Sequence, residues 1–168
     1  MEFWDLSISI LNENNVVIDT IYPKYAHIPQ QYATNCTASY DYALIYVEED
    51  LSEYGVFSLG VARDGLINNN TSVTVSGYPQ YDMNNDGIVE WGQRYKSNGN
   101  ITNITSSRIK YNADTSGGTS GGPVYIENTY YGVDYKTAIA IHTSAGNYGV
   151  RITSDILKFY NANPYKTA

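Results

Sequence analysis

The sequence predicts an all-β domain, a barrel or a sandwich, that ends in one short helix. Apolar and polar residues alternate over short runs, and clusters of Asn, Gly, Asp and Ser separate these runs. Tyrosine is also abundant, with 18 residues against 3 Phe and 2 Trp. Tyrosine suits half-buried strands, because its ring packs while its hydroxyl reaches water. Many short strands at this spacing are typical of barrels and sandwiches.

The expected strands follow one another along the chain, and each is an alternating or apolar run bounded by turn residues. In order they are LSISIL (6–11), VVIDTIY (16–22), YALIYV (42–47), SVTVSGY (72–78), IVEWGQRY (88–95), SRIKY (107–111), GPVYIE (122–127), TAIAIHT (137–143) and YGVRIT (148–153). The clusters NENN, RDGLINNN, NNDG, KSNGN and SAGN are expected to be the turns between them.

The helix is expected over residues 153–160, TSDILKFY. Thr153 or Ser154 can cap its first turn, and Asp155 favours the positive end of its dipole. Ile156 and Tyr160 would share one face. We therefore expect a single helix at the C-terminal end of the domain.

Composition narrows the classes of partner. The 168 residues are 42% hydrophobic and 16% charged, and the net charge is −7. This charge and the lack of any basic run argue against a nucleic-acid or anionic-membrane partner, since both require clustered Lys and Arg. Cys36 is the one cysteine, so no internal disulfide is expected. The first ten residues do not have the pattern of a signal peptide, and no run approaches the ~18 apolar residues of a membrane span.

The densest motif is ADTSGGTSGGPVYI, residues 113–126. Ser120 lies between small residues, so its hydroxyl can be accessible while neighbouring amides point towards one place, as a serine nucleophile requires. The string G-x-S-x-G also occurs in α/β-hydrolases, where it leads into a helix; here Pro123 and a strand follow, which excludes that motif. The alternative is a glycine turn at a barrel corner.

Two further residues are candidates for the same chemistry. Asp41 begins the apolar strand 42–47, where a desolvated carboxylate needs partners; a histidine N–H is one, and the alternative is a capping or turn aspartate. His142 lies at the end of strand 137–143, and the alternative for it is a strand-end histidine whose hydrogen bonds are structural.

A calcium loop is the only cofactor site that the sequence suggests. DMNNDG contains Asp82, Asn84 and Asp86 at EF-hand spacing, but Gln93 stands where the loop needs its bidentate glutamate. An Asn-Gly type hairpin accounts for the same residues. We therefore expect no cofactor, with calcium at these three residues as the alternative.

The segments DYALI, VSGYP, DTSGGTSGGPVY and IHTSAGNYGVRIT, in this order before a short helix, resemble the trypsin-like (chymotrypsin-fold) serine proteases, and among them most closely the bacterial glutamyl endopeptidases. The resemblance runs from about residue 18 to 160. It implies a double six-stranded β-barrel with the first barrel incomplete. The implied limits are 1–62 for the partial first barrel, 63–152 for the second barrel, and 153–168 for the C-terminal helix and tail.

The resemblance also implies the roles of individual residues and the partners. Ser120 would be the nucleophile and Asp41 the triad carboxylate, with the amides of Gly118 and Ser120 as the oxyanion hole. Thr115 and His142 would bind an acidic substrate side chain, and Thr143, Ser144 and Ala145 would pair with the substrate backbone. The implied activity is hydrolysis of peptides or proteins after Glu through an acyl-enzyme, in an extracellular location.

One part of the pattern does not match. The family's base histidine precedes the aspartate, whereas this chain has only His27 and His142. His142 is assigned to the specificity pocket, and the residues around His27 match a later segment of the first barrel; the alternative is that His27 is the base. We expect that the chain lacks an N-terminal part, and that this part or a partner chain supplies the base. The alternative is an inactive protease-like fold or fragment that binds a peptide or a partner chain.

Overall fold

The computed structural model describes residues 6–61, 67–80 and 93–162. The chain divides into two compact units: Met1–Val56 with Lys158–Ala168, and Phe57–Leu157. The first unit therefore contains both ends of the chain. The domain limits that the sequence predicts, at 62/63 and 152/153, stay predictions.

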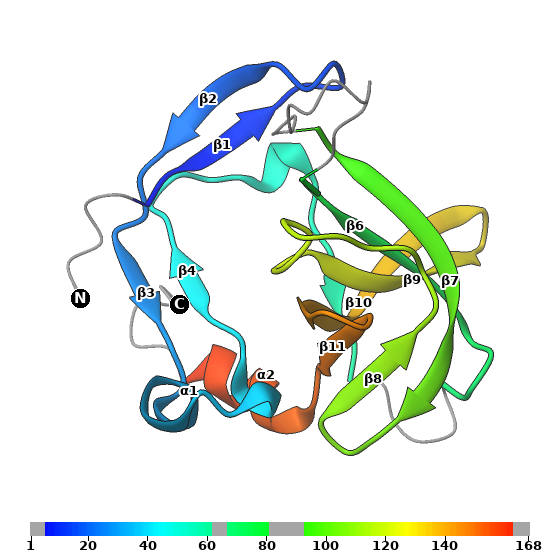
Figure 1. Ribbon diagram of the computed structural model, residues 1–168. Helices are drawn as coiled ribbons and strands as arrows, with labels where there is room; N and C mark the ends of the chain where they lie inside the picture. The colour runs from blue at the N-terminus through cyan, green and yellow to red at the C-terminus, as the bar shows by residue number, and fades with distance from the viewer. Residues whose placement is uncertain (1–5, 62–66, 81–92, 163–168) are drawn as a thin grey trace. The chain divides into compact units, whose positions relative to one another are not determined.

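A closed antiparallel barrel forms the second unit (Figure 1). Six strands run in the order β11-β8-β7-β6-β9-β10, and the pairing of β10 with β11 closes the ring. The short β5 (Ser58–Leu59) adds to β10 in parallel. The barrel strands are β6 (Ser72–Gly77), β7 (Tyr95–Ile104), β8 (Arg108–Tyr111), β9 (Pro123–Tyr130), β10 (Val133–Ser144) and β11 (Tyr148–Arg151).

Period-two alternation directs the apolar side chains of these strands into the barrel. In β8, for example, Ile109 and Tyr111 are buried, while Arg108 and Lys110 are half-buried on the other face. The core gathers side chains from five of the six strands and two flanking residues: Ile67, Val73, Val75, Ile101, Ile109, Tyr111, Ala113, Val124, Ile139 and Ala140. The predicted all-β class is thus confirmed.

In its described residues, the first unit contains four short strands in two separate pairs. β1 (Ile8–Leu11) pairs with β2 (Val17–Ile21), and β3 (Tyr25–His27) pairs with β4 (Leu44–Tyr46). Between them lie α1 (Gln30–Asn35) and the 3₁₀ turn η1 (Ala38–Tyr40); η2 (Ser52–Tyr54) follows β4. Within the described residues these strands do not close into a ring, as expected for an incomplete first barrel.

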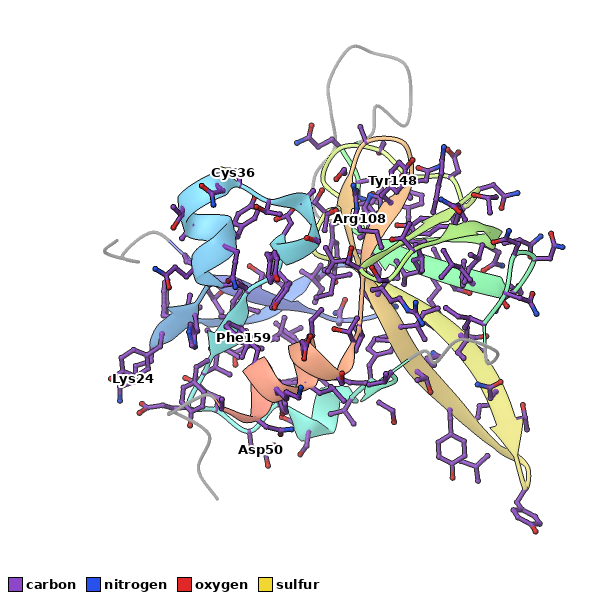
Figure 2. All side chains as sticks on the ribbon, turned by 90° about the horizontal axis from the view of Figure 1, so that it is seen from below. Lys24, Cys36, Asp50, Arg108, Tyr148 and Phe159 are labelled. Atoms are coloured by element: carbon purple, nitrogen blue, oxygen red, sulfur yellow. The ribbon has the colours of Figure 1, made fainter. Side chains whose placement is uncertain are left out.

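The predicted C-terminal helix is present as α2 (Ser154–Asn161). Thr153 caps it: the Thr153 carbonyl accepts from the amide of Leu157 at 3.1 Å, and its hydroxyl accepts from Ile156 at 3.4 Å. Phe159, labelled in Figure 2, packs against the ring of His27 with centroids 4.5 Å apart. It also meets the ring of Tyr42 edge-on at 5.3 Å. The last helix therefore supplies an aromatic side chain to the first unit.

The structure corrects two local expectations. KSNGN (96–100) is not a turn but part of β7, where Lys96, Asn98 and Asn100 are exposed and Gly99 faces Ala113 so closely that a Cβ would lie 2.3 Å from the Ala113 nitrogen. Pairing with β6 holds this polar run extended, which propensity alone does not predict. The helix α1 was not expected either; it follows Pro29 and ends at Cys36, whose φ of 49° is left-handed.

Three other expectations concern features outside the barrel. Cys36 is an exposed free thiol. None of the helices in the described residues has the length and apolar character needed to cross a bilayer. Asp82, Asn84 and Asp86, the alternative calcium ligands, lie outside the described residues, and the remaining part of the chain contains no group of three or more His, Cys, Asp or Glu that could hold a metal ion.

Candidate active site

Ser120 lies in the tight loop that leads into β9. The amide of Thr119 donates to the carbonyl of Ser116 at 3.2 Å, and the amide of Gly122 donates to the carbonyl of Thr119 at 3.0 Å. Gly118 and Gly121 have φ values of +89° and +86°, which side chains other than glycine rarely adopt. Two successive turns therefore expose Ser120, and both need a glycine in the left-handed conformation. These turns explain why glycine is so frequent in this segment.

The same loop fixes the direction of two backbone amides. The carbonyl of Gly117 accepts from the amide of Gln80 at 2.7 Å, and the carbonyl of Thr119 is held by Gly122. In a trans peptide the N–H points opposite to the C=O, so the amides of Gly118 and Ser120 point away from these partners. Neither amide has an acceptor in the described part of the chain. Both are available to an external oxygen.

The end of β10 holds the serine loop from one side. The Ser120 hydroxyl donates to the carbonyl oxygen of Thr143 at 2.9 Å. The amide of Gly121 donates to the carbonyl of His142 at 2.8 Å, and the His142 amide donates to the carbonyl of Gly122 at 2.9 Å. Three hydrogen bonds thus set the position of Ser120 against Thr143, the first residue of the predicted substrate strand. In that segment Thr143 and Ser144 are half-buried, and Ala145 is exposed.

His142 is buried and its ring is held from the barrel interior. Its Nδ1 is hydrogen-bonded to the Tyr111 hydroxyl, which also reaches the carbonyl oxygen of Tyr148 at 3.2 Å. Burial lowers the pKa of His142, and a hydrogen bond to the Tyr148 carbonyl opposes that shift. Burial likewise raises the pKa of the Tyr111 phenol above its usual value. Both pKa shifts favour a neutral His142 imidazole beside a protonated Tyr111 phenol. The imidazole Nε2 has no partner within the described residues.

Thr115 lies on the other segment predicted to bind substrate. Its hydroxyl donates to the side-chain oxygen of Asn147, in the turn between β10 and β11. Tyr111 donates its backbone amide to the carbonyl of the same Asn147 at 3.1 Å. Asn147, Tyr111 and Tyr148 therefore connect the predicted substrate residues, and sequence analysis did not identify any of them. The alternation of β8 predicts that Tyr111 faces inward, but nothing in the sequence predicts its contact with His142, 31 residues away.

Asp41 belongs to the first unit. A hydrogen bond from the Tyr32 hydroxyl to the Asp41 carboxylate raises the pKa of that phenol. Tyr32 lies in α1, so this unexpected helix supplies a partner for the predicted triad carboxylate. His27 in the same unit packs its ring on Phe159. Both histidines of the chain thus have contacts unrelated to a serine hydroxyl.

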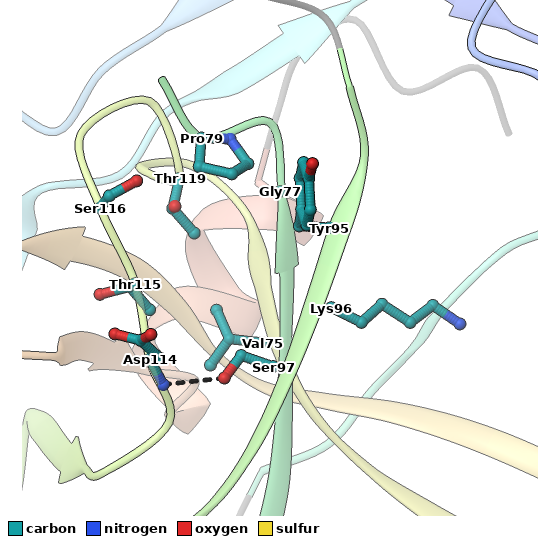
Figure 3. Close-up of a pocket in the computed structure, with 10 residues that line it drawn as sticks. All are labelled: Val75, Gly77, Pro79, Tyr95, Lys96, Ser97, Asp114, Thr115, Ser116 and Thr119. Carbon is teal, nitrogen blue, oxygen red and sulfur yellow. Dashed lines mark hydrogen bonds between the residues drawn. The ribbon is translucent and has the colours of Figure 1, made fainter. Parts of the chain in front are cut away.

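A cavity of about 380 Å³ adjoins the segment before Ser120 (Figure 3). The amide of Asp114 donates to the Ser97 hydroxyl across it at 2.8 Å. Its volume is at the lower end of the range of small-molecule sites. Thr115 is its one predicted substrate residue, and its walls are Val75, Gly77, Pro79, Tyr95, Lys96, Ser97, Asp114, Thr115, Ser116 and Thr119.

A closed six-stranded antiparallel barrel that carries a serine in a glycine loop, followed by a short C-terminal helix, defines the chymotrypsin-fold class of serine peptidases. Residues 12–130 match the family described as the trypsin-like peptidase domain. The chain belongs to this family.

Individual relatives agree with that assignment. The chain is 29% identical over 138 residues to a glutamyl endopeptidase of Bacillus licheniformis, which covers 77% of this chain and 40% of that relative. It thus spans about two fifths of the relative's length. Among solved structures, a Glu endopeptidase in complex with MPD superposes with a TM-score of 0.76 at 21% identity, covering 95% of this chain and 72% of the other. The protease Anisep from Arthrobacter nicotinovorans gives 0.61 at 21% identity, with 85% and 66% covered.

Proposed function

We propose that this chain is the serine-bearing part of an endopeptidase that cleaves peptide bonds after acidic residues. One observation carries the proposal: Ser120 is exposed, and its own amide and that of Gly118 have no acceptor in the described residues. Such amides stabilise the oxyanion that forms when a hydroxyl attacks a carbonyl. Membership of the trypsin-like peptidase family makes peptides and proteins the substrate class.

In this mechanism the Ser120 oxygen attacks the peptide carbonyl while a histidine base takes its proton. The amides of Gly118 and Ser120 bind the oxyanion, the leaving amine receives the proton, and water later releases the acyl group. Asp41 is proposed to orient the base. Because His27 packs on Phe159 and His142 bonds to Tyr111, we propose that another segment or a partner chain supplies the base.

We assign recognition of the acidic side chain to His142 and Thr115. The imidazole has only its Nε2 available, because Tyr111 occupies Nδ1. The Tyr111 hydroxyl has one hydrogen, which we assign to Nδ1 rather than to the Tyr148 carbonyl, so that the neutral ring carries its proton on Nε2 and can donate it to a carboxylate. The Thr115 hydroxyl donates to the side-chain oxygen of Asn147 in the free structure, and we propose that it turns to the carboxylate as a second donor when substrate binds. The name of the Bacillus relative, glutamyl endopeptidase, supports this choice of substrate.

Tyr111→Phe tests this recognition. Without the phenol, the Tyr148 carbonyl becomes the partner of Nδ1, which moves the proton to Nδ1 and leaves a bare Nε2 facing the carboxylate. The preference for Glu over Gln, as a ratio of kcat/KM values, should fall about tenfold, equivalent to one hydrogen bond of about 1.4 kcal/mol. The ¹⁵N chemical shifts of the imidazole should report the change of tautomer. An unchanged tautomer and an unchanged preference would contradict the assignment.

The second candidate function is peptide or partner binding without catalysis. One observation favours it: the Ser120 hydroxyl donates its hydrogen to the Thr143 carbonyl, and no imidazole in the described residues accepts it. Loss of the base of a serine triad lowers turnover by on the order of a million-fold. Under this alternative, the same loop and strand would bind a peptide without cleaving it.

A fluorophosphonate probe separates the two functions. We expect the chain to become labelled when the segment or partner chain that supplies the base is present, and mass spectrometry of the digest to place the label on Ser120. Ser116, an exposed serine four residues earlier in the same loop, should remain unmodified. Absence of labelling, together with binding of a Glu-containing peptide, would support the non-catalytic function. The implied extracellular location and the choice between no cofactor and calcium stay predictions.

A further inference from the structure

Two cations on the outer face of β8 flank one aromatic ring of β11. The guanidinium carbon of Arg108 lies 4.5 Å from the centroid of the Tyr148 ring, and the ammonium of Lys110 lies 5.2 Å from it. Figure 2 shows Arg108 and Tyr148 next to each other. The pairing of Tyr148 with Lys110 in register explains the arrangement. The strands thus place two positive charges against the ring of one tyrosine.

These charges have no anionic partner in the described part of the chain. Neither Arg108 nor Lys110 lies within ion-pair distance of a carboxylate there, although acidic residues outnumber basic ones by 17 to 10. The Nε of Arg108 is also shielded from solvent and bonded to none of the described residues. A guanidinium nitrogen that is shielded from solvent and has no acceptor is uncommon, and a ligand carboxylate at the other nitrogens of the group would compensate its charge.

The cluster touches the strand on which we propose that the substrate pairs. Nη2 of Arg108 donates to the Ser144 hydroxyl at 3.0 Å. Ser144 directly follows Thr143, whose carbonyl holds the Ser120 hydroxyl. One residue of backbone therefore separates the contact of the nucleophile from the contact of the guanidinium.

Strand geometry determines which substrate residues meet the cluster. His142 bonds to Tyr111, on the inner face of β8, whereas Arg108 and Lys110 occupy the opposite face. The side chains of an extended peptide alternate between two faces. If the residue before the scissile bond extends to His142, the second and fourth residues counted back from that bond extend to the side of Arg108.

We propose that Arg108 and Lys110, with Ser144 and Tyr148, form a subsite for a second acidic side chain of the peptide, at the second or fourth residue before the scissile bond. The proposal rests on the proposed function, because it uses the same substrate strand. The negative charge of the whole chain disfavours acidic peptides, and this local pair of cations offsets that repulsion where the peptide lies.

The experiment measures the dissociation constants of peptides ending in Glu, the product form, so that it does not depend on catalysis. One set of peptides exchanges Glu for Gln at the last residue and tests the proposed recognition of the acidic side chain by His142. The other exchanges Glu for Gln at the second or the fourth residue and tests the subsite. We expect Glu at one of these two positions to bind about tenfold more tightly than Gln, and salt to reduce the ratio.

Variants assign the effect to the cluster. The first ratio is the affinity for Glu over Gln at the last residue, and the second is the same ratio at the second or fourth residue. Arg108→Gln should bring the second ratio close to one and leave the first ratio unchanged. Arg108→Lys retains the positive charge and should therefore retain part of the second ratio. Lys110→Gln should reduce the ratio without altering the buried contact of Arg108. Lys136→Gln, at an exposed lysine of β10 eight residues before Ser144, is the matched control and should leave both ratios unchanged.

The two proposals fail in different ways. A second ratio near one in the wild type, or one that persists in both Arg108→Gln and Lys110→Gln, would overturn the subsite, even if the last-residue ratio is large. A last-residue ratio near one would overturn recognition by His142, whatever the second ratio is. No measurable binding of the doubly acidic peptide would overturn both. Thermal unfolding of each variant shows whether the fold is retained.

Discussion

Once the histidine base is supplied, replacing Ser120 with alanine is expected to remove hydrolysis of a peptide ester or amide that follows Glu, lowering kcat by on the order of a million-fold. Alanine keeps the loop, since the two turns depend on Gly118, Gly121 and Gly122, but it lacks the oxygen that attacks the carbonyl. The measurement is a progress curve with a chromogenic acyl-Glu substrate, followed over hours so that residual turnover is visible.

Ser116→Ala provides the matched control for this experiment. Ser116 is a second exposed hydroxyl of the same loop, and within the described residues its Oγ makes only long contacts, of 3.4 and 3.5 Å, to carbonyl oxygens. Its removal should leave the rate nearly unchanged. Retention of most of the wild-type rate by Ser120→Ala would show that another group is the nucleophile, and the assignment of Ser120 would be wrong.

Gly122→Ala should lower the free energy of unfolding by about 3 kcal/mol. A Cβ on Gly122 would lie 2.1 Å from the carbonyl oxygen of Ser76 in β6 and 2.9 Å from that of Thr119. Both neighbours are backbone, so neither can turn aside like a side chain. The Gly122 carbonyl also accepts from the amide of His142, and displacement would disturb this bond. Urea unfolding monitored by circular dichroism gives the value.

The adjacent Gly121 is a control, because it has a left-handed φ but no close neighbour, whereas Gly122 has close neighbours but no left-handed φ. The φ of +86° at Gly121 is left-handed, but a Cβ there would have no atom within 4 Å. Gly121→Ala should therefore cost only about 1 kcal/mol, through backbone conformation alone. Equal losses for the two variants would contradict the close approach of the serine loop to β6.

The strands were predictable where the residue pattern itself determines the outcome. In β6, alternation of Val73 and Val75 with polar residues suffices, because one face of the strand is buried. KSNGN shows the limit: its sequence favours a turn, but pairing with β6 imposes an extended conformation. The helix α1 has no buried residue, so its sequence lacks the apolar periodicity that would predict a helix.

The candidate site was predictable in part, for a similar reason. Ser120 lies in a local glycine motif whose bonds join neighbours in sequence, such as Thr119 with Ser116. The roles of Tyr111 and Arg108 depend on contacts with residues 31 and 36 positions away, which only the closed barrel brings together. Contacts of this kind depend on tertiary pairing, and one sequence contains no record of them.

The packing of Phe159 on His27 and Tyr42 bears on how the protein is made. The first compact unit is discontinuous in sequence, since it includes Lys158–Ala168. During synthesis, residues near the N-terminus leave the ribosome long before this helix is translated. The first unit therefore cannot complete this packing until the helix that carries Phe159 emerges. Chaperones and cellular proteases would meet this nascent chain at its most vulnerable stage.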